Sequence, residues 1–312
     1  MCHEGGHSDS IAETTCLSRT THQSSGPVKR SQPSSPGGVL HALWTLCKPS
    51  KVDVIKPTDA GLSYRTRAPR GIPPRVDVYR PKGPGPHPSV VLVHGGGFLI
   101  GSRTLKPVRY VATRLVQAGF AVAAPDYRLV FRGGRLDEAI DDVATALGWW
   151  REQAPRYALD PERISVMGMS AGATLMWLAL SRDNISAHRI VSLFGLYDFA
   201  WLSDRRSAWL RQRLLRSPDL ASWQSRSPLS HAHAEAPCLL IHGDADQMTP
   251  VMHAHAMKQT RDAEGLSTTL DVIPGARHGF LNDADDPVCE PCVARIVDFL
   301  CAPQSEGARA TP

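Results

Sequence analysis

Ser170 lies at the centre of the pattern Gly168-Met169-Ser170-Ala171-Gly172, which fits G-x-S-x-G. This pattern is typical of a sharp turn between a strand and a helix that projects a serine oxygen clear of a sheet. The flanking residues suit that turn, because an apolar run at Ile164–Met167 precedes it and an apolar stretch at Ala171–Ser181 follows it. We therefore predict that Ser170 is a nucleophile for acyl transfer.

A second glycine-rich motif, His94-Gly95-Gly96-Gly97, follows the apolar run Val90–Val93. Three glycines in a row let backbone amides converge on one point, as the oxyanion of a tetrahedral intermediate requires. A single donor of this kind typically contributes ~10²–10³ in rate. The motif therefore predicts an oxyanion-binding loop at the end of a strand.

A serine hydroxyl is a poor nucleophile at neutral pH and needs a base that a carboxylate orients. Two later loops supply these groups in the order serine, acid, histidine that is usual for the nucleophile turn. The first is His242-Gly243-Asp244-Ala245-Asp246, and the second contains His278. We predict that His278 is the general base, and that Asp246 or Asp244 is the acid.

Strands and helices alternate along most of the chain. Short apolar runs predict strands at 76–79, 90–93, 120–124, 164–167, 190–194, 238–241 and 269–273. Apolar residues at helical spacing predict helices at 107–118, 136–150 and 171–181. This order predicts a mostly parallel sheet with helices on both faces, whose chemistry lies at the carboxyl ends of the strands.

Four motifs together resemble the hormone-sensitive-lipase group of α/β-hydrolase esterases. They are His94–Gly97 with Phe98, the run Asp126-Tyr127-Arg128-Leu129, Gly168–Gly172 and the His278 loop, within about 76–300. The resemblance implies an α/β-hydrolase fold, with a mostly parallel central sheet and a small helical cap. It also implies an oxyanion hole made by the amides of Gly96, Gly97 and Ala171.

The chain departs from that group in three places. Met169 replaces the aspartate usual in the serine motif, and Val130–Gly134 replaces the usual acidic, proline-rich run. The loop His242–Pro250 looks more like the H-G-x-x-D pattern of dienelactone-hydrolase and prolyl-oligopeptidase relatives. That pattern assigns the catalytic acid to Asp246 and leaves Asp244 as its rival.

The composition along the chain predicts one folded domain with a tail at each end. Residues 1–38 are rich in small and polar residues and predict a disordered tail. The α/β-hydrolase domain is expected at 39–302, beginning with a short helix at its edge, and a C-terminal tail at 303–312. A cap insertion is expected at about 199–230.

The cap segment contains tryptophans and arginines. Arginines with interleaved aromatic residues can bind nucleic acid, but this segment lies between two core strands, where a cap is usual. We expect its tryptophans and leucines to face an apolar pocket and its arginines to face solvent; these residues are Trp201, Trp209, Trp223, Arg205, Arg206, Arg211, Arg213, Arg216 and Arg226.

Several classes of protein are not favoured by the composition. The net charge of +5 is too small to indicate a nucleic-acid partner, and no apolar run reaches the ~18 residues needed to span a bilayer. Seven unevenly spaced cysteines do not form a secreted disulfide framework. A cytoplasmic monomer or homodimer without metal or organic cofactor is expected. Neither the Cys289/Cys292 pair nor the N-terminal set Cys2, His3, His7 and Cys16 predicts a zinc site.

These patterns predict a serine hydrolase that cleaves short- to medium-chain carboxylic esters through an acyl-enzyme on Ser170. The same three side chains would also suit an amidase or formamidase, or an acyltransferase that passes the acyl group to an alcohol or amine. A non-catalytic binding protein is a further alternative, which intact Ser170, Asp246 and His278 argue against.

Overall fold

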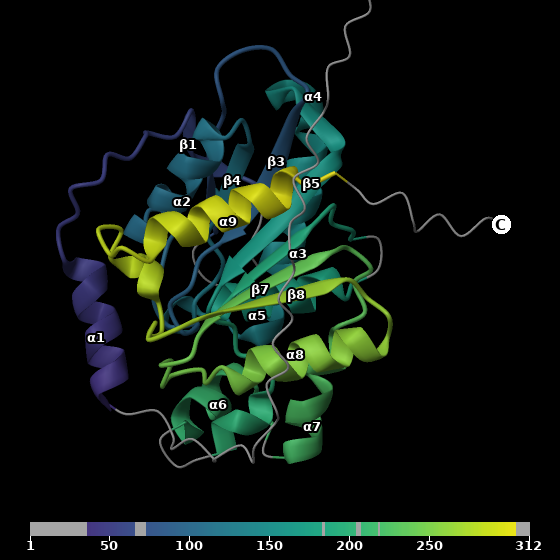
Figure 1. The fold of residues 1–312 in the computed structure, drawn as a ribbon. Helices are drawn as coiled ribbons and strands as arrows, with labels where there is room; N and C mark the ends of the chain where they lie inside the picture. Colours follow the sequence, from purple (N-terminus) through teal and green to yellow (C-terminus); the bar gives the residue numbers. More distant parts are fainter. Residues whose placement is uncertain (1–35, 66–72, 183–184, 204–206, 218, 304–312) are drawn as a thin grey trace, which may run out of the picture. The chain divides into compact units, whose positions relative to one another are not determined.

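A computed structural model describes residues 36–65, 73–182, 185–203, 207–217 and 219–303. Its centre is one eight-stranded sheet in the order β1-β2-β4-β3-β5-β6-β7-β8 (Figure 1). Strand β2 is antiparallel to both of its neighbours, β1 and β4. The other six strands, β4-β3-β5-β6-β7-β8, are parallel to one another. The strand bounds are β1 Asp59–Ser63, β2 Arg75–Tyr79, β3 His87–Val93, β4 Ala121–Pro125, β5 Leu159–Met169, β6 Ile190–Leu193, β7 Cys238–Gly243 and β8 Thr268–Ile273.

Helices connect the parallel strands. The α-helices are α1 Pro36–Cys47, α2 Lys106–Gln117, α3 Leu136–Glu152, α4 Ala154–Tyr157, α5 Ala171–Leu180, α6 Ala208–Leu214, α7 Leu220–Ser225, α8 Met252–Ala263 and α9 Cys289–Cys301. Short 3-10 helices are η1 Val130–Arg132, η2 Phe199–Ser203, η3 Pro228–His231 and η4 Phe280–Asn282.

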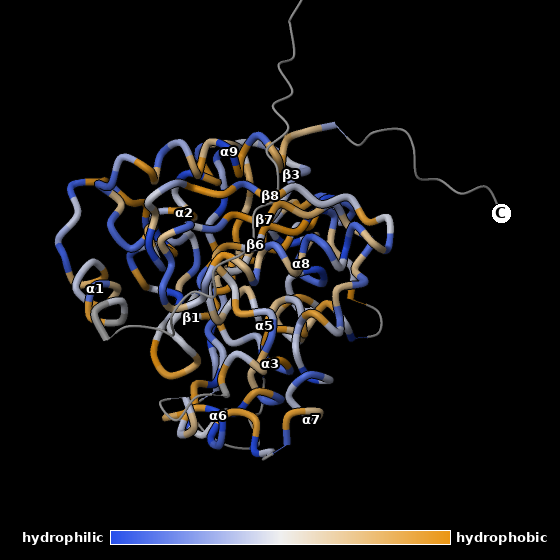
Figure 2. Tube along the Cα trace, turned by 60° about the horizontal axis from the view of Figure 1, so that its bottom comes forward, coloured by the Kyte–Doolittle hydropathy of each residue, from blue (hydrophilic) through white to orange (hydrophobic). Residues whose placement is uncertain are grey.

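The two faces of the sheet bury separate apolar clusters. Successive residues of a strand point to opposite faces, so Val91 and Val93 of β3 join one cluster while Val90 and Leu92 join the other. Helices α3, α5 and α8 cover the first face, and α2 and α9 cover the second (Figure 2). The predicted α/β-hydrolase fold, a mostly parallel sheet between helical layers, is therefore confirmed.

All seven predicted strands are present; β5 begins earlier than expected, at Leu159, and the other strands lie close to their expected bounds. Strand β1 was not predicted, because Asp59–Ser63 contains a glycine and is only half-buried at the sheet edge. Helix α1 begins at Pro36, so the last three residues of the predicted tail are helical. Residues 1–35 and 304–312 lie outside the described part, and so does the zinc candidate set Cys2, His3, His7 and Cys16.

Helical segments η2, α6, α7 and η3 lie between β6 and β7, where the cap was predicted. Their side chains differ from the expectation. Trp223 is buried in the apolar cluster and the Arg211 guanidinium lies over its ring at 4.3 Å, whereas Trp209 is 43% exposed. The prediction that the tryptophans face a pocket is therefore wrong for Trp223 and Trp209. Arg211 is half-buried, and Arg213 and Arg216 are exposed, as predicted for the arginines. Arg205 and Arg206 lie outside the described residues.

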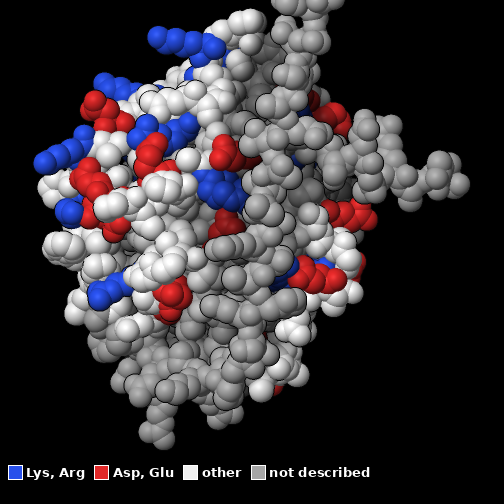
Figure 3. Space-filling view, viewed as in Figure 1, with Lys and Arg blue, Asp and Glu red and all other residues white. Residues whose placement is uncertain are grey.

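Charged side chains of both signs are intermingled on the described part of the face in Figure 3. Ion pairs among the described residues include Arg114 with Glu290 at 2.6 Å and Arg295 with Asp271 at 2.9 Å. Among the described residues, no helix is long and apolar enough to cross a membrane.

A buried ion pair fixes the loop after β4. The Arg128 guanidinium donates to both carboxylate oxygens of Asp142 on α3, at 2.7 and 3.0 Å, and the Arg128 amide donates at 2.9 Å. Both side chains are almost fully buried. Because the adjacent Tyr127 contacts the glycine loop after β3, this pair positions the functional site as well as the fold.

We expect Asp142→Ala to lower the free energy of unfolding by up to about 3–5 kcal/mol, because buried Arg128 loses its bidentate partner and keeps the more distant Asp141 carboxylate at 3.6 Å. Asp137→Ala on the same helix is the matched control. Asp137 is exposed and pairs with Arg226 at the surface, so its loss should cost less than about 1 kcal/mol. Urea unfolding of both variants measures the difference, and equal small losses would show that the buried pair does not stabilise this loop.

Candidate active site

Ser170 lies in the tight turn between β5 and α5. Its backbone has φ 52° and ψ −120°, a strained conformation for a residue with a side chain. Close packing leaves no room for side chains on either side of it. A Cβ on Gly168 would lie 2.6 Å from Ala173 Cα, and one on Gly172 would lie 2.3 Å from the Val93 carbonyl oxygen. The two glycines of the motif are therefore required by this geometry.

The glycine loop after β3 lies directly against this turn. A Cβ on Gly95 would be 3.2 Å from Ser170 Cβ, and Gly96 and Gly97 have φ values of 126° and 60° that favour glycine. Ala171 is the first residue of α5, so its amide has no partner within the helix. The partial positive charge at the N-terminus of α5 increases the attraction of these amides for a negatively charged oxygen.

The segment 126–128, which follows β4, contacts the glycine loop through Tyr127. The Tyr127 hydroxyl donates to the His94 carbonyl at 3.0 Å, and the two rings stack with centroids 4.3 Å apart. Burial raises the pKa of Tyr127 and lowers the pKa of His94. Both groups therefore stay neutral at pH 7. Asp126 accepts the Arg103 amide at 2.6 Å and pairs with the Arg103 guanidinium.

His278 lies between Ser170 and Asp246. Its Nε2 is 2.8 Å from Ser170 Oγ, and its Nδ1 is 2.7 Å from Asp246 Oδ2. His278 is buried, and the Phe194 ring packs edge-on against its imidazole with centroids 5.2 Å apart. The three predicted residues therefore form a continuous chain of hydrogen bonds, although they come from three loops that are far apart in the sequence.

The Asp246 carboxylate is buried but surrounded by donors. Oδ1 accepts the amides of Met248 and Thr249, both at 2.9 Å, and Oδ2 also lies 3.3 Å from His242 Nε2. Burial alone would raise the pKa of this carboxyl. The facing imidazoles of His278 and His242 outweigh burial and lower the Asp246 pKa well below its usual range. Asp246 is therefore ionised throughout the neutral pH range.

Asp244, the alternative acid, points elsewhere. It is exposed, and its Oδ1 accepts the Gly275 amide at 2.6 Å. This contact ties the loop after β7 to the loop after β8, which leads to His278. The structure therefore places Asp246, and not Asp244, against the imidazole.

Two polar residues beside the acid were not among the predicted site residues. The Thr249 hydroxyl is 3.0 Å from His278 Nδ1, and His242 Nε2 is 2.6 Å from the Thr249 carbonyl oxygen. Thr249 lies three residues after Asp246, and that short spacing within one loop is the signal that could have indicated it.

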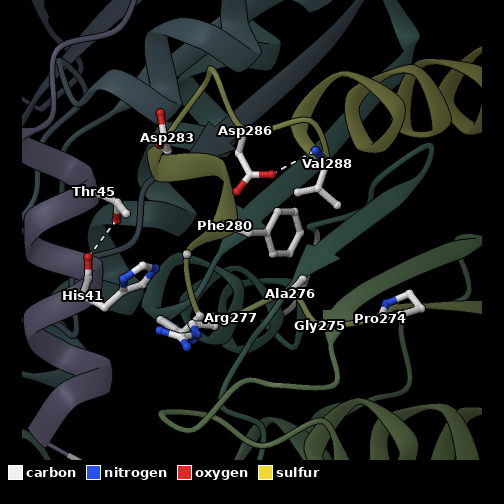
Figure 4. Close-up of a pocket in the computed structure, with 12 residues that line it drawn as sticks. His41, Thr45, Pro274, Gly275, Ala276, Arg277, Phe280, Asp283, Asp286 and Val288 are labelled. Carbon is white, nitrogen blue, oxygen red and sulfur yellow. Dashed lines mark hydrogen bonds between the residues drawn. The ribbon is translucent and has the colours of Figure 1, made fainter.

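Two cavities lie on the α1 side of the His278 loop. The larger has about 270 Å³ and the smaller about 160 Å³, and His41, Arg277 and His278 line both. In Figure 4, Asp283 and Asp286 lie on the side of the larger cavity that is away from Arg277. The Thr45 hydroxyl donates to the His41 carbonyl at 3.0 Å. Among the described residues, no cluster of three or more histidine, cysteine or acidic side chains could bind a metal ion.

Comparisons with known proteins find esterases among the relatives of this chain. The chain is 29% identical over 68% of its length to Esterase LipQ of Mycobacterium tuberculosis (strain ATCC 25618 / H37Rv), of which it covers 55%. It is 29% identical over 70% of its length to an ethyl acetate hydrolase of Pseudomonas putida, covering 74% of that protein. A truncated carbohydrate esterase from gut microbiota has the same fold, with a TM-score of 0.68, 20% identity, and coverage of 81% of this chain and 98% of that one.

The fold and the relatives define the chain as an α/β-hydrolase similar to carboxylesterases, as the sequence motifs predicted. The profile of the BD-FAE family matches residues 76–260, more than half of the chain, so the chain belongs to the BD-FAE family. The chain spans just over half of the length of LipQ.

We expect Gly172→Ala to reduce kcat/KM by ~10² or more, because the new methyl group would push α5 and Ser170 away from the glycine loop. The control is Gly148→Ala on α3, where an added Cβ would meet nothing within 4 Å. That variant should keep full activity and gain up to about 1 kcal/mol of stability from helix propensity. Kinetics on an activated ester test both, and a fully active Gly172→Ala enzyme would contradict the role of the close contact.

Proposed function

We propose that this protein is a carboxylic ester hydrolase that forms an acyl-enzyme on Ser170. The contact that carries the proposal is the 2.8 Å hydrogen bond between Ser170 Oγ and His278 Nε2, continued by the 2.7 Å bond from Nδ1 to Asp246. A serine so placed beside a base is the arrangement that acyl transfer requires.

In the first half of the proposed reaction, Ser170 Oγ attacks the ester carbonyl while His278 Nε2 takes the hydroxyl proton. The imidazolium is stabilised by the ionised Asp246. The negative charge on the carbonyl oxygen is received by the amides of Gly96, Gly97 and Ala171. When the tetrahedral intermediate collapses, His278 returns the proton to the departing alcohol.

In the second half, water replaces the alcohol. His278 takes a proton from the water as it attacks the acyl-serine, and a second tetrahedral intermediate forms in the same oxyanion hole. Its collapse returns the proton to Ser170 Oγ and releases the carboxylic acid. Neither half requires a metal or an organic cofactor.

Short- to medium-chain esters of small molecules are the proposed substrates. The similarity to an ethyl acetate hydrolase and to esterases supports this class. No specific observation favours the amidase, acyltransferase or non-catalytic alternatives. The cytoplasmic location, the monomer or homodimer assembly, the absence of a nucleic-acid partner and the domain bounds remain predictions from the sequence.

The function is tested with Ser170→Ala. We expect a fluorophosphonate probe to label the wild type and not the variant, and turnover of p-nitrophenyl butyrate to fall by ~10⁶ if the three residues act as a unit. Ser181→Ala, just beyond α5, is the control and should be labelled like the wild type. Equal labelling of Ser170→Ala, or no turnover of any ester by the wild type, would refute the proposal.

The acid is tested with a pair of isosteric variants. We expect Asp246→Asn to lower kcat by ~10⁴, because the amide can no longer stabilise the imidazolium. Asp244→Asn should lower kcat by less than about tenfold, because the Asp244 side chain accepts the Gly275 amide through Oδ1, which asparagine retains. Measurement of kcat for both decides the assignment, and a larger loss in Asp244→Asn would overturn it.

A further inference from the structure

Thr249 lies at the point where the loop after β7 turns toward α8, and its side chain is buried. Its hydroxyl oxygen is 3.0 Å from His278 Nδ1, 3.1 Å from Asp246 Oδ2 and 3.0 Å from the Phe194 carbonyl oxygen. One small side chain thus contacts the base, the acid and the end of β6. The Thr249 amide already bonds Asp246 Oδ1, so the loop does not need the hydroxyl in order to bind the acid.

The position of the ring proton on His278 determines which hydrogen bonds the Thr249 hydroxyl can make. When His278 Nε2 accepts the Ser170 hydroxyl, Nδ1 must carry the ring proton. That N–H faces Asp246 Oδ2 at 2.7 Å and the Thr249 oxygen at 3.0 Å. The single Thr249 proton has the Phe194 carbonyl and Asp246 as acceptors within reach. With either acceptor, the Thr249 oxygen stays beside Nδ1 and limits rotation of the imidazole.

Phe194 further restricts the orientation of the His278 imidazole. Its backbone has φ 39°, which is unfavourable for a residue with a Cβ, and the hydrogen bond from Thr249 to its carbonyl helps to stabilise that conformation. The Phe194 ring in turn packs edge-on against the imidazole at an interplanar angle of 69°. The imidazole is thereby bounded by Phe194 on one side and by Thr249 and Asp246 at Nδ1.

We propose that Thr249 is a positioning residue whose hydroxyl holds the His278 imidazole in register with Asp246 and Ser170. The inference rests on the proposed ester hydrolysis. It adds a fourth residue to the hydrogen-bonded chain, one that touches no substrate and acts through the orientation of the base.

Two substitutions separate the hydroxyl from the shape of the side chain. Thr249→Val keeps the branched shape and removes the hydroxyl, and Thr249→Ser keeps the hydroxyl. We expect Thr249→Val to lower kcat about tenfold with KM unchanged, because only the orientation of the base is altered. Thr249→Ser should stay within about threefold of the wild type. The downfield proton resonance of His278 Nδ1–H should shift or broaden in Thr249→Val and be kept in Thr249→Ser.

Thr113→Val is the matched control for a purely structural effect. Thr113 on α2 is also buried. Its hydroxyl donates to the Arg109 carbonyl and accepts from the Ile55 amide, and both of these partners are backbone groups. This variant should be destabilised like Thr249→Val and keep the wild-type kcat and Nδ1 resonance.

The inference is overturned if Thr249→Val keeps the wild-type kcat and resonance, or if Thr249→Ser is impaired as strongly as Thr249→Val. It is also overturned if Thr113→Val loses kcat to the same extent. Failure of the proposed function is distinguishable, because it would appear as a wild type without ester turnover while the Nδ1 resonance remained measurable.

Discussion

The site depends on the close approach of two chain segments, the end of β3 and the first turn of α5. Gly172 permits this approach because a Cβ there would meet the Val93 and His94 carbonyl oxygens, and Gly168 lets the end of β5 lie against Ala173 of α5. Ser170, between these two glycines, has a positive φ. The parallel pairing of β3 with β5 brings the glycine loop and the serine turn to the same edge of the sheet. Ser170 and the amides of the proposed oxyanion hole are therefore positioned largely by backbone packing, which the hydrogen bond from Tyr127 to the His94 carbonyl supports.

The acid and the base are positioned differently, through polar contacts between loops. Asp246 is fixed by donors from its own loop, whereas His278 comes from the loop after β8 and must be brought to it. The Asp244 contact with the Gly275 amide joins those two loops. An exposed carboxylate thus contributes to the geometry of the site although it does not touch the imidazole.

The sequence was sufficient to predict the parallel core and the three side chains that meet in the site. Buried parallel strands have continuous apolar runs, and the positions of Ser170 and His278 follow from strand ends and chain order. The sequence was not sufficient to predict β1, because its residues are half-buried at an edge of the sheet. The environments of Trp209 and Arg211 also could not be predicted, because they depend on how the cap helices pack. The spacing of Thr249 from Asp246 indicates a contact with the acid, but its contacts with His278 and Phe194, which come from other strands, have no local sequence pattern.

The loop from His242 to Thr249 has a property that matters for protein engineering. Both Asp246 Oδ1 bonds, the His242 contact and the Thr249 contact arise within eight consecutive residues. Most of the contacts to the Asp246 carboxylate are therefore local, and the loop is joined to the rest of the fold through the Phe194 carbonyl and the Gly275 amide. A graft of this loop onto another parallel strand would have to reproduce those two contacts, whereas a graft of the serine turn would have to reproduce a whole neighbouring strand.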